Sequence, residues 1–263
     1  MNDEQTDGGA GPLELRIDAK TFVSADGASV EIVRGLNLRL EAGGFGAMIG
    51  PSGCGKTTIL HIAAGLDADF AGQRRVPGAR LGIVFQEPRL LPWRTVAENI
   101  RLVLPAQGSL DQGSMDHGSL DHGPPDDLAD LIETLGLGSH LAHFPGELSL
   151  GLARRVAIAR AFAVRPDFLL LDEPFVSLDE AVASRLREEV AVLTERHRMT
   201  TLLVTHDLRD AVQLADRLFF LSARPASIVS ETSLPPPRRM RSRQAINRIL
   251  EELGTLSVDQ SVT

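Results

Sequence analysis

The sequence predicts an α/β fold with a mainly parallel sheet, and three observations carry that prediction. Several short runs are apolar at every position, whereas half-buried strands alternate. Stretches with helical spacing separate these runs, as expected of strands covered on both faces by helices. The length of 263 residues, with 43% apolar and 24% charged residues, suits one large or two modest globular domains. The expected inner strands are 45–49, 81–85, 168–171, 201–204 and 218–221, and the helices between them are 56–66, 151–163, 181–197 and 208–214.

The remaining segments carry weaker signals. Thr95 and Glu98 have the spacing of a capping box, which predicts a helix from there to about residue 104. Residues 1–12 are polar and acidic, and we expect them to be a disordered lead. Further expected elements are strands at 13–18 and 30–40, and helices at 126–135 and, after the prolines at 235–237, at 243–253.

An insert at residues 107–125 repeats a five-residue unit, GSLDQ, GSMDH, GSLDH. Units this short and polar cannot bury enough surface to build a repeat architecture, so we expect a surface loop. His117 and His122 with the nearby aspartates leave a weak metal site open as the alternative to a solvated linker.

Composition argues against nucleic-acid binding, internal disulfides and membrane-spanning helices. The net charge of −8 argues against nucleic acid as the main partner, because phosphate backbones are met by basic faces. A single cysteine, Cys54, cannot form an internal disulfide. No apolar run approaches the ~20 residues that a membrane-spanning helix needs, so we expect any membrane role to depend on a partner.

The strongest motif follows the apolar run 45–49. It matches G-x-x-x-x-G-K-[ST] in full and opens an expected helix, which is the context that a phosphate-binding loop requires. The glycines let successive amide N–H groups turn toward phosphate oxygens, and the helix N-terminus adds partial positive charge. Lys56 is expected to reach the β- and γ-phosphates and Thr57 to ligate Mg²⁺. The predicted nucleoside triphosphate site comprises Gly50, Pro51, Ser52, Gly53, Cys54, Gly55, Lys56, Thr57 and the adjoining Thr58.

Two acids follow the next buried strand. The run 168–171 would deliver Asp172 and Glu173 to the edge of the sheet that carries the phosphate loop. Asp172 suits the outer shell of Mg²⁺, and Glu173 is placed to orient the attacking water and accept its proton. The alternative is that Asp-Glu-Pro simply caps the next helix.

Two further polar residues end strands at the same predicted edge. His206 can hydrogen-bond a γ-phosphate oxygen, and Gln86 offers an amide oxygen to Mg²⁺ or to the lytic water. Taken alone, each is an ordinary residue at a strand end, so both assignments depend on the phosphate loop and the acid pair.

From about residue 13 to 229 these elements together resemble the ATP-binding cassette (ABC) ATPases. GPSGCGKTT is similar to the Walker A segment of that family, LLLLDEP to Walker B, Gln86 to the Q-loop, and His206 to the switch histidine. Ser177-Leu-Asp179 resembles the D-loop, and residues 148–152, LSLGL, resemble the signature LSGGQ. The resemblance implies a P-loop NTPase core over 13–232, an N-terminal antiparallel β subdomain, an inserted helical signature subdomain at about 87–163, and a C-terminal helix and tail at 233–263.

The resemblance also implies a head-to-tail dimer that binds ATP and Mg²⁺. Ser149 and Gly151 would press on the γ-phosphate held by the opposite copy. Here the sequence departs from the family pattern: Leu150 replaces the first signature glycine and Leu152 the glutamine. This puts tight closure and the maximal rate in doubt without removing the site.

The family stacks adenine on an aromatic residue near the N-terminus, and Phe22 is the candidate here, with a core position as its alternative.

Residues 86–100 resemble the importer ATPases for nitrate, sulfonates and taurine. Trp93 in that segment is a candidate anchor for membrane permease subunits, with packing inside the helical subdomain as the alternative. The resemblance further implies a solute-binding protein as an indirect partner and a peripheral position on the cytoplasmic face of the membrane. Two other functions stay open: a non-transport ABC ATPase and a degenerate cassette with weak hydrolysis.

Overall fold

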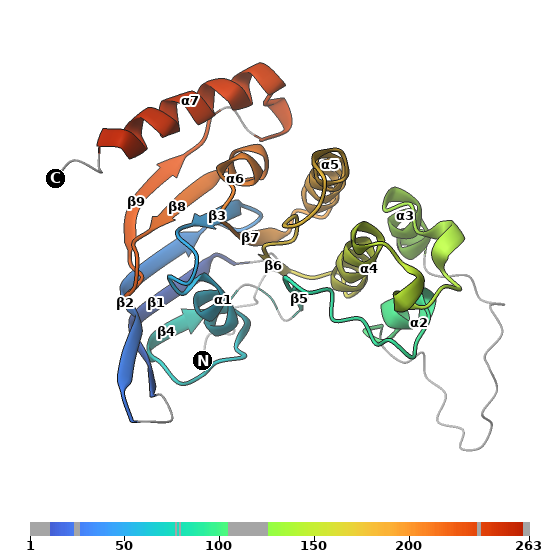
Figure 1. Cartoon of the computed structure of the whole chain (residues 1–263), viewed down its shortest axis with the longest axis horizontal. Coiled ribbons are helices and arrows are strands. Elements are labelled where there is room, and N and C mark those ends of the chain that lie inside the picture. Colours follow the sequence, from blue (N-terminus) through green and yellow to red (C-terminus); the bar gives the residue numbers. More distant parts are fainter. Residues whose placement is uncertain are drawn as a thin grey trace, which may run out of the picture.

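The computed structural model describes residues 11–23, 27–76, 78, 80–104, 126–235 and 238–259. Its centre is a six-stranded sheet with the order β5-β6-β7-β3-β8-β9 (Figure 1). Neighbouring strands from β5 to β8 pair in parallel, and β9 pairs antiparallel with β8. The predicted α/β fold is therefore confirmed. The strands are β3 (Phe45–Ile49), β5 (Leu81–Val84), β6 (Phe168–Asp172), β7 (Thr200–Thr205), β8 (Arg217–Leu221) and β9 (Ile228–Ser233).

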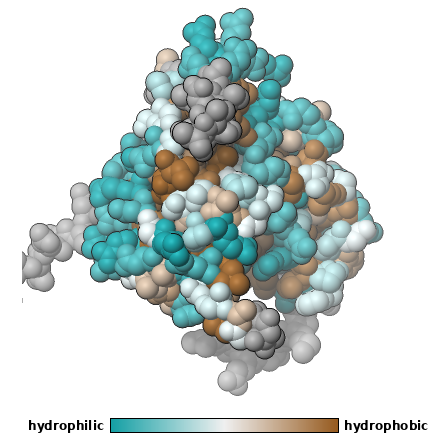
Figure 2. All heavy atoms as spheres, turned by 60° about the vertical axis from the view of Figure 1, so that its left-hand side comes forward, coloured by the Kyte–Doolittle hydropathy of each residue, from teal (hydrophilic) through white to brown (hydrophobic). Residues whose placement is uncertain are grey.

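A separate three-stranded antiparallel sheet has the order β2-β1-β4, as the family resemblance implies. Its strands are β1 (Leu13–Val23), β2 (Ser29–Leu40) and β4 (Ala71–Arg75). Neither β4 nor β9 was predicted. β4 is exposed at all its positions and has the polar sequence AGQRR, so no apolar pattern marks it. Figure 2 views the molecule from the side that lies on the left in Figure 1. On this side, hydrophobic patches lie within a mainly hydrophilic surface.

The helices agree with the predicted segments in position and differ at their ends. The first helix stops two residues before its predicted end, because Gly65 takes a left-handed conformation (φ 75°) and closes it with bonds to His61 and Ile62. The capping box of Thr95 and Glu98 is present, but its helix ends at Arg101. The helices are α1 (Lys56–Ala64), α2 (Val96–Arg101), α3 (Asp126–Thr134), α4 (Leu150–Ala163), α5 (Glu180–Arg196), α6 (Leu208–Leu214) and α7 (Arg243–Asp259).

Strands β3, β6 and β7 are buried at every position, which explains why their sequences do not alternate, whereas β5, expected as an inner strand, lies at the edge of the sheet and is only half-buried at Leu81 and Ile83. Phe45 and Ala47 of β3 belong to one hydrophobic cluster, with side chains of α4, α5 and α6. Met48 of the same strand belongs to a second cluster, with side chains of α1 and of the β1-β2 pair. The central sheet is therefore the middle layer between two apolar cores.

Helices α2, α3 and α4 form a lobe beside the edge of the sheet that β5 occupies (Figure 1). The predicted insert at 107–125, with His117 and His122, lies outside the described residues. Among the helices of the described part of the chain, none is long and apolar enough to cross a membrane.

Candidate active site

Four neighbouring strands end together at one edge of the central sheet. The registers pair Val84 with Leu171, Asp172 with Val204, and Ile49 with Thr205. The ends of these strands and the segments that follow them contain every sequence-predicted residue of the phosphate and acid groups. Parallel pairing therefore brings together residues that are more than a hundred positions apart in the chain.

The phosphate loop runs from the end of β3 to the start of α1. Gly55, the residue before α1, has φ 122°, and a Cβ there would lie 2.8 Å from Cγ2 of Ile32. Only glycine fits both the backbone angle and the close approach of β2. Arg224, in the turn between β8 and β9, donates from Nη2 to the carbonyl oxygen of Gly53 at 2.6 Å.

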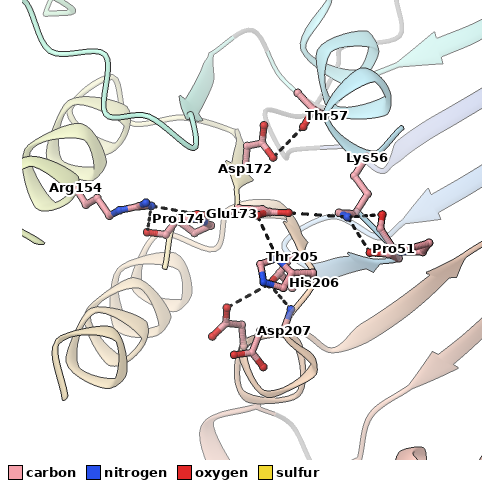
Figure 3. A network of polar contacts seen from close by, with 12 residues as sticks. Pro51, Lys56, Thr57, Arg154, Asp172, Glu173, Pro174, Thr205, His206 and Asp207 are labelled. Atoms are coloured by element: carbon pink, nitrogen blue, oxygen red, sulfur yellow. Dashed lines mark hydrogen bonds and ion pairs between the residues drawn. The ribbon is translucent and has the colours of Figure 1, made fainter. Parts of the chain in front are cut away.

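The Lys56 side chain lies inside this loop and is 5% exposed. Its Nζ donates to the carbonyl oxygens of Gly50 (2.8 Å) and Pro51 (3.0 Å) and lies 3.9 Å from Oε1 of Glu173 (Figure 3). The sheet edge thus places the one ammonium of the loop against the predicted general base.

Thr57 and Asp172 form a pair of hard oxygen donors. Thr57 Oγ1 donates to Asp172 Oδ1 at 3.4 Å (Figure 3). Burial raises the pKa of the Asp172 carboxyl, as does the nearby charge of Glu173, while the Thr57 hydrogen bond opposes the rise. Oxygen donors of this kind fit Mg²⁺. Gln86 is exposed and follows β5 by two residues, at the same edge of the sheet.

Glu173 departs from ordinary backbone geometry. Its φ is +44°, in the left-handed region that non-glycine residues seldom adopt, and its N–H donates to the Val204 carbonyl at 2.9 Å. Its Oε2 lies 3.2 Å from Nδ1 of His206, which is about half exposed (Figure 3). The strained turn directs the carboxylate toward the histidine and the lysine at once.

The signature segment begins α4, one residue earlier than predicted. Ser149 is its N-cap, and the Ser149 hydroxyl accepts from Leu152 N at 3.3 Å. Leu150 is the first helical residue and is 44% exposed. A Cβ on Gly151 would lie 3.1 Å from Cγ1 of Val182 in α5, so α4 and α5 are packed closely where they begin.

A family model described as "ABC transporter" matches residues 33–176. The aliphatic sulfonates import ATP-binding protein SsuB 2 of Pseudomonas syringae pv. tomato is 40% identical over 232 residues, which cover 87% of this chain and 91% of that protein. SsuB of Bacillus licheniformis is 37% identical over 263 residues, which cover 94% and 98% of the two chains. A dimeric structure of MJ0796, a bacterial ABC transporter cassette, superposes with a TM-score of 0.70 at 25% identity, covering 86% of this chain and 100% of that one.

This chain belongs to the ABC transporter family. It is an ATP-binding, ATP-hydrolysing subunit of that family, and the predicted resemblance to the sulfonate-importer ATPases is confirmed. A second solved structure of the same cassette, in a post-hydrolysis state bound to ADP and Pi, matches with a TM-score of 0.68. In the described part of the chain, no group of three or more His, Cys, Asp or Glu residues could hold a metal ion.

The ABC ATPase places its other predicted residues at the surface. Phe22 is 46% exposed on β1, with the Lys20 ammonium 4.7 Å from its ring centre, so the alternative of a core position is wrong. Trp93 is 70% exposed in the turn before α2, while nearby Leu90 packs against the core. Asp179 caps α5 by accepting from Val182 N at 3.0 Å.

Three arginines around the site were not predicted from the sequence. Arg154 of α4 donates to the carbonyl oxygens of Glu173 (3.1 Å) and Pro174 (2.6 Å), and so joins α4 to the turn after β6 (Figure 3). Arg224 donates to the phosphate loop, and the buried Arg187 donates to Asp210, which accepts a hydrogen bond from Thr205 beside His206. Arginine within a helix is ordinarily solvent-facing, and no spacing rule marks a guanidinium whose acceptors are distant in sequence.

Proposed function

We propose that this ABC ATPase drives the import of an aliphatic sulfonate or a similar small anion through separate membrane permease subunits. The observation that supports this most is the identity of 37–40% to proteins named as aliphatic sulfonates import ATP-binding proteins. On this proposal the subunit works at the cytoplasmic face of the membrane, and a solute-binding protein delivers the anion. The solute itself does not contact this subunit.

In the proposed mechanism, the phosphate loop and Lys56 bind the triphosphate of ATP. Thr57, Gln86 and, through water, Asp172 would hold Mg²⁺, which supplies charge neutralisation at the phosphates when bound. The amide N–H groups of the loop and the N-terminus of α1 act on the same oxygens. The remaining contribution of the chain is to orient water and to move its proton.

Glu173 is the proposed general base. The contact of its carboxylate with His206 at 3.2 Å holds it at the edge where the strands end. There it accepts the proton of the attacking water, and His206 donates a hydrogen bond to the γ-phosphate oxygen. The strain at Glu173 (φ +44°) supports this role, because such geometry persists at sites whose surroundings over-determine it.

Each ATP site is completed by a second copy of the chain in head-to-tail orientation. Ser149 and Gly151, at the start of α4, present the N-terminus of a 14-residue helix to the opposite γ-phosphate. Asp179 of the D-loop would contact the opposite phosphate loop. Phe22, exposed beside Lys20, is the proposed adenine platform, and Trp93 the anchor for the permease.

The test of the transport proposal is uptake by whole cells of the source organism. Deleting the gene is expected to abolish energy-dependent uptake of labelled ethanesulfonate, and the wild-type gene but not Lys56→Ala should restore it. Taurine and nitrate uptake, measured in parallel, assign the anion. Unchanged uptake of all three anions in the deletion strain would contradict the proposal.

A further inference from the structure

The centre of α5 contains a charge that the mechanism above does not use. Arg187 is 2% exposed and is the largest fully buried side chain of the described residues. Its Nη2 donates to Glu180 Oε1 at 2.7 Å, and its Nη1 donates to Asp210 Oδ1. A buried guanidinium is costly unless paired, so these two acceptors fix its position.

The planar guanidinium of Arg187 forms a fork with two arms, one bonded to Asp210 and one to Glu180. The arm bonded to Asp210 leads to the segment that carries His206. Asp210 lies in α6, and its second oxygen accepts from Thr205 Oγ1 at 3.2 Å. The same hydroxyl accepts from the backbone N–H of Asp207 at 3.0 Å (Figure 3 shows Thr205, His206 and Asp207). Thr205 and Asp207 flank His206, so the backbone on both sides of the histidine is held through Asp210.

The other arm reaches the start of α5. Glu180 is the first residue of that helix and follows its N-cap, Asp179. The Glu180 side chain is 72% exposed, so this arm lies at the surface where the D-loop turns into α5. A pocket of about 180 Å³ is lined by residues of both arms and of the catalytic turn, including Glu173, His206 and Arg187.

We propose that Arg187 is a positioning residue that ties the orientation of His206 to the position of the D-loop end of α5. The inference rests on the proposed roles of His206 and Asp179. A movement imposed on the D-loop by the partner copy is transmitted by one rigid group, because the planar fork joins the two carboxylates through fixed geometry. We therefore expect the rate of ATP hydrolysis to depend on the Arg187 contacts, whereas ATP binding by the phosphate loop is independent of them.

A purely structural role makes a different prediction. If Arg187 served only stability, any loss of its contacts would lower the melting temperature in proportion to its effect on activity. Lysine keeps the charge but has no fork to span Glu180 and Asp210 together. A positioning role therefore predicts a lower kcat of ATP hydrolysis, whereas a purely stabilising role predicts only a lower melting temperature.

The first variant is Glu180→Gln, which weakens the exposed arm and leaves the buried pair with Asp210 in place. Glu188→Gln is its matched control, because Glu188 is exposed on the same helix. We expect Glu180→Gln to lower kcat about 3- to 10-fold with unchanged KM for MgATP and unchanged Tm, and the control to change none of these. Equal kcat in the two variants would overturn the proposal.

Thr205→Val and Arg187→Lys test the buried arm. Thr205→Val keeps the shape of the side chain and removes the hydroxyl that joins Asp210 to the Asp207 N–H, so kcat should fall while KM stays. Arg187→Lys should lower kcat more than Glu180→Gln, and a loss confined to Tm would contradict the proposal. Full hydrolysis by His206→Ala would instead refute the proposed active site, which separates that failure from a failure of Arg187.

Discussion

The two halves of the proposed ATP site differ in how far one chain completes them. In the phosphate half, Lys56 and Asp172 are buried and Glu173 nearly so, and each contacts another member of the group. In the signature half, Ser149 and Asp179 are exposed and bond within the first turns of their own helices. The difference indicates that the phosphate half is preorganised in one copy, whereas the signature half presents groups outward, as a partner-completed site requires.

The largest expected effect lies in the phosphate half. Lys56→Ala removes the ammonium that neutralises the β- and γ-phosphates, and we expect ATP hydrolysis to fall by at least ~10²-fold. The measurement is phosphate release by the purified protein at saturating MgATP. Retained hydrolysis in Lys56→Ala would refute the assigned site.

Glu173→Gln separates ATP binding from hydrolysis within the phosphate half, because we expect the variant still to bind ATP. The amide keeps the shape of the side chain but cannot accept the proton of water, so the rate should fall by ~10²–10⁴-fold. Since ATP would bind without being hydrolysed, gel filtration with MgATP should show a dimer. A protein that stays monomeric under these conditions would contradict the closed pair for the isolated subunit.

Ser149→Ala tests the signature half with a smaller expected effect. The change removes both the N-cap of α4 and the hydroxyl proposed to face the opposite γ-phosphate. We expect kcat to fall about tenfold with little change in ATP affinity, and stability to fall by about 1 kcal/mol from the lost cap. Thr95→Ala, which removes the cap of α2, is the control: it should cost similar stability but not the same activity.

The smallest effect is expected at the departure from the family signature. Leu150 is exposed at the first position of α4, where the side chain would face the partner copy. Leu150→Gly should raise ATPase activity a few-fold while lowering helix stability by up to ~1 kcal/mol. Leu150→Ala separates the two effects, since it shortens the side chain without the cost of glycine. Unchanged activity in both variants would mean that the departure is neutral.

Sequence alone predicted the parts of the fold whose signal is local. The runs 168–171 and 218–221 were predicted as strands because each of their residues is apolar. The structure places these residues in the two hydrophobic cores on either side of the sheet, where polar side chains would be unfavourable. The phosphate loop could be predicted because its backbone geometry allows only glycine at certain positions, and this gives the loop a recognisable sequence motif. By contrast, β4 is polar and exposed, and only its pairing with β1 makes it a strand.

The parts of the site that sequence did not predict depend on contacts between distant segments. Arg224 and Gly53 are 171 residues apart, and Arg187 and Asp210 lie on different helices. Nothing in the local pattern of either arginine distinguishes it from a solvated surface residue. The exposure of Trp93 and Phe22 likewise depends on packing that their local sequence does not specify.

In the proposed dimer, one copy supplies the phosphate half and the other copy the signature half of each ATP site. Mixing two inactive variants, Lys56→Ala and Ser149→Arg, and measuring ATP hydrolysis tests this arrangement. A head-to-tail pair of one of each has one site with both halves intact, so the mixture should hydrolyse ATP well above either variant alone. If activity in the mixture equals the average of the two variants measured separately, the composite site is wrong.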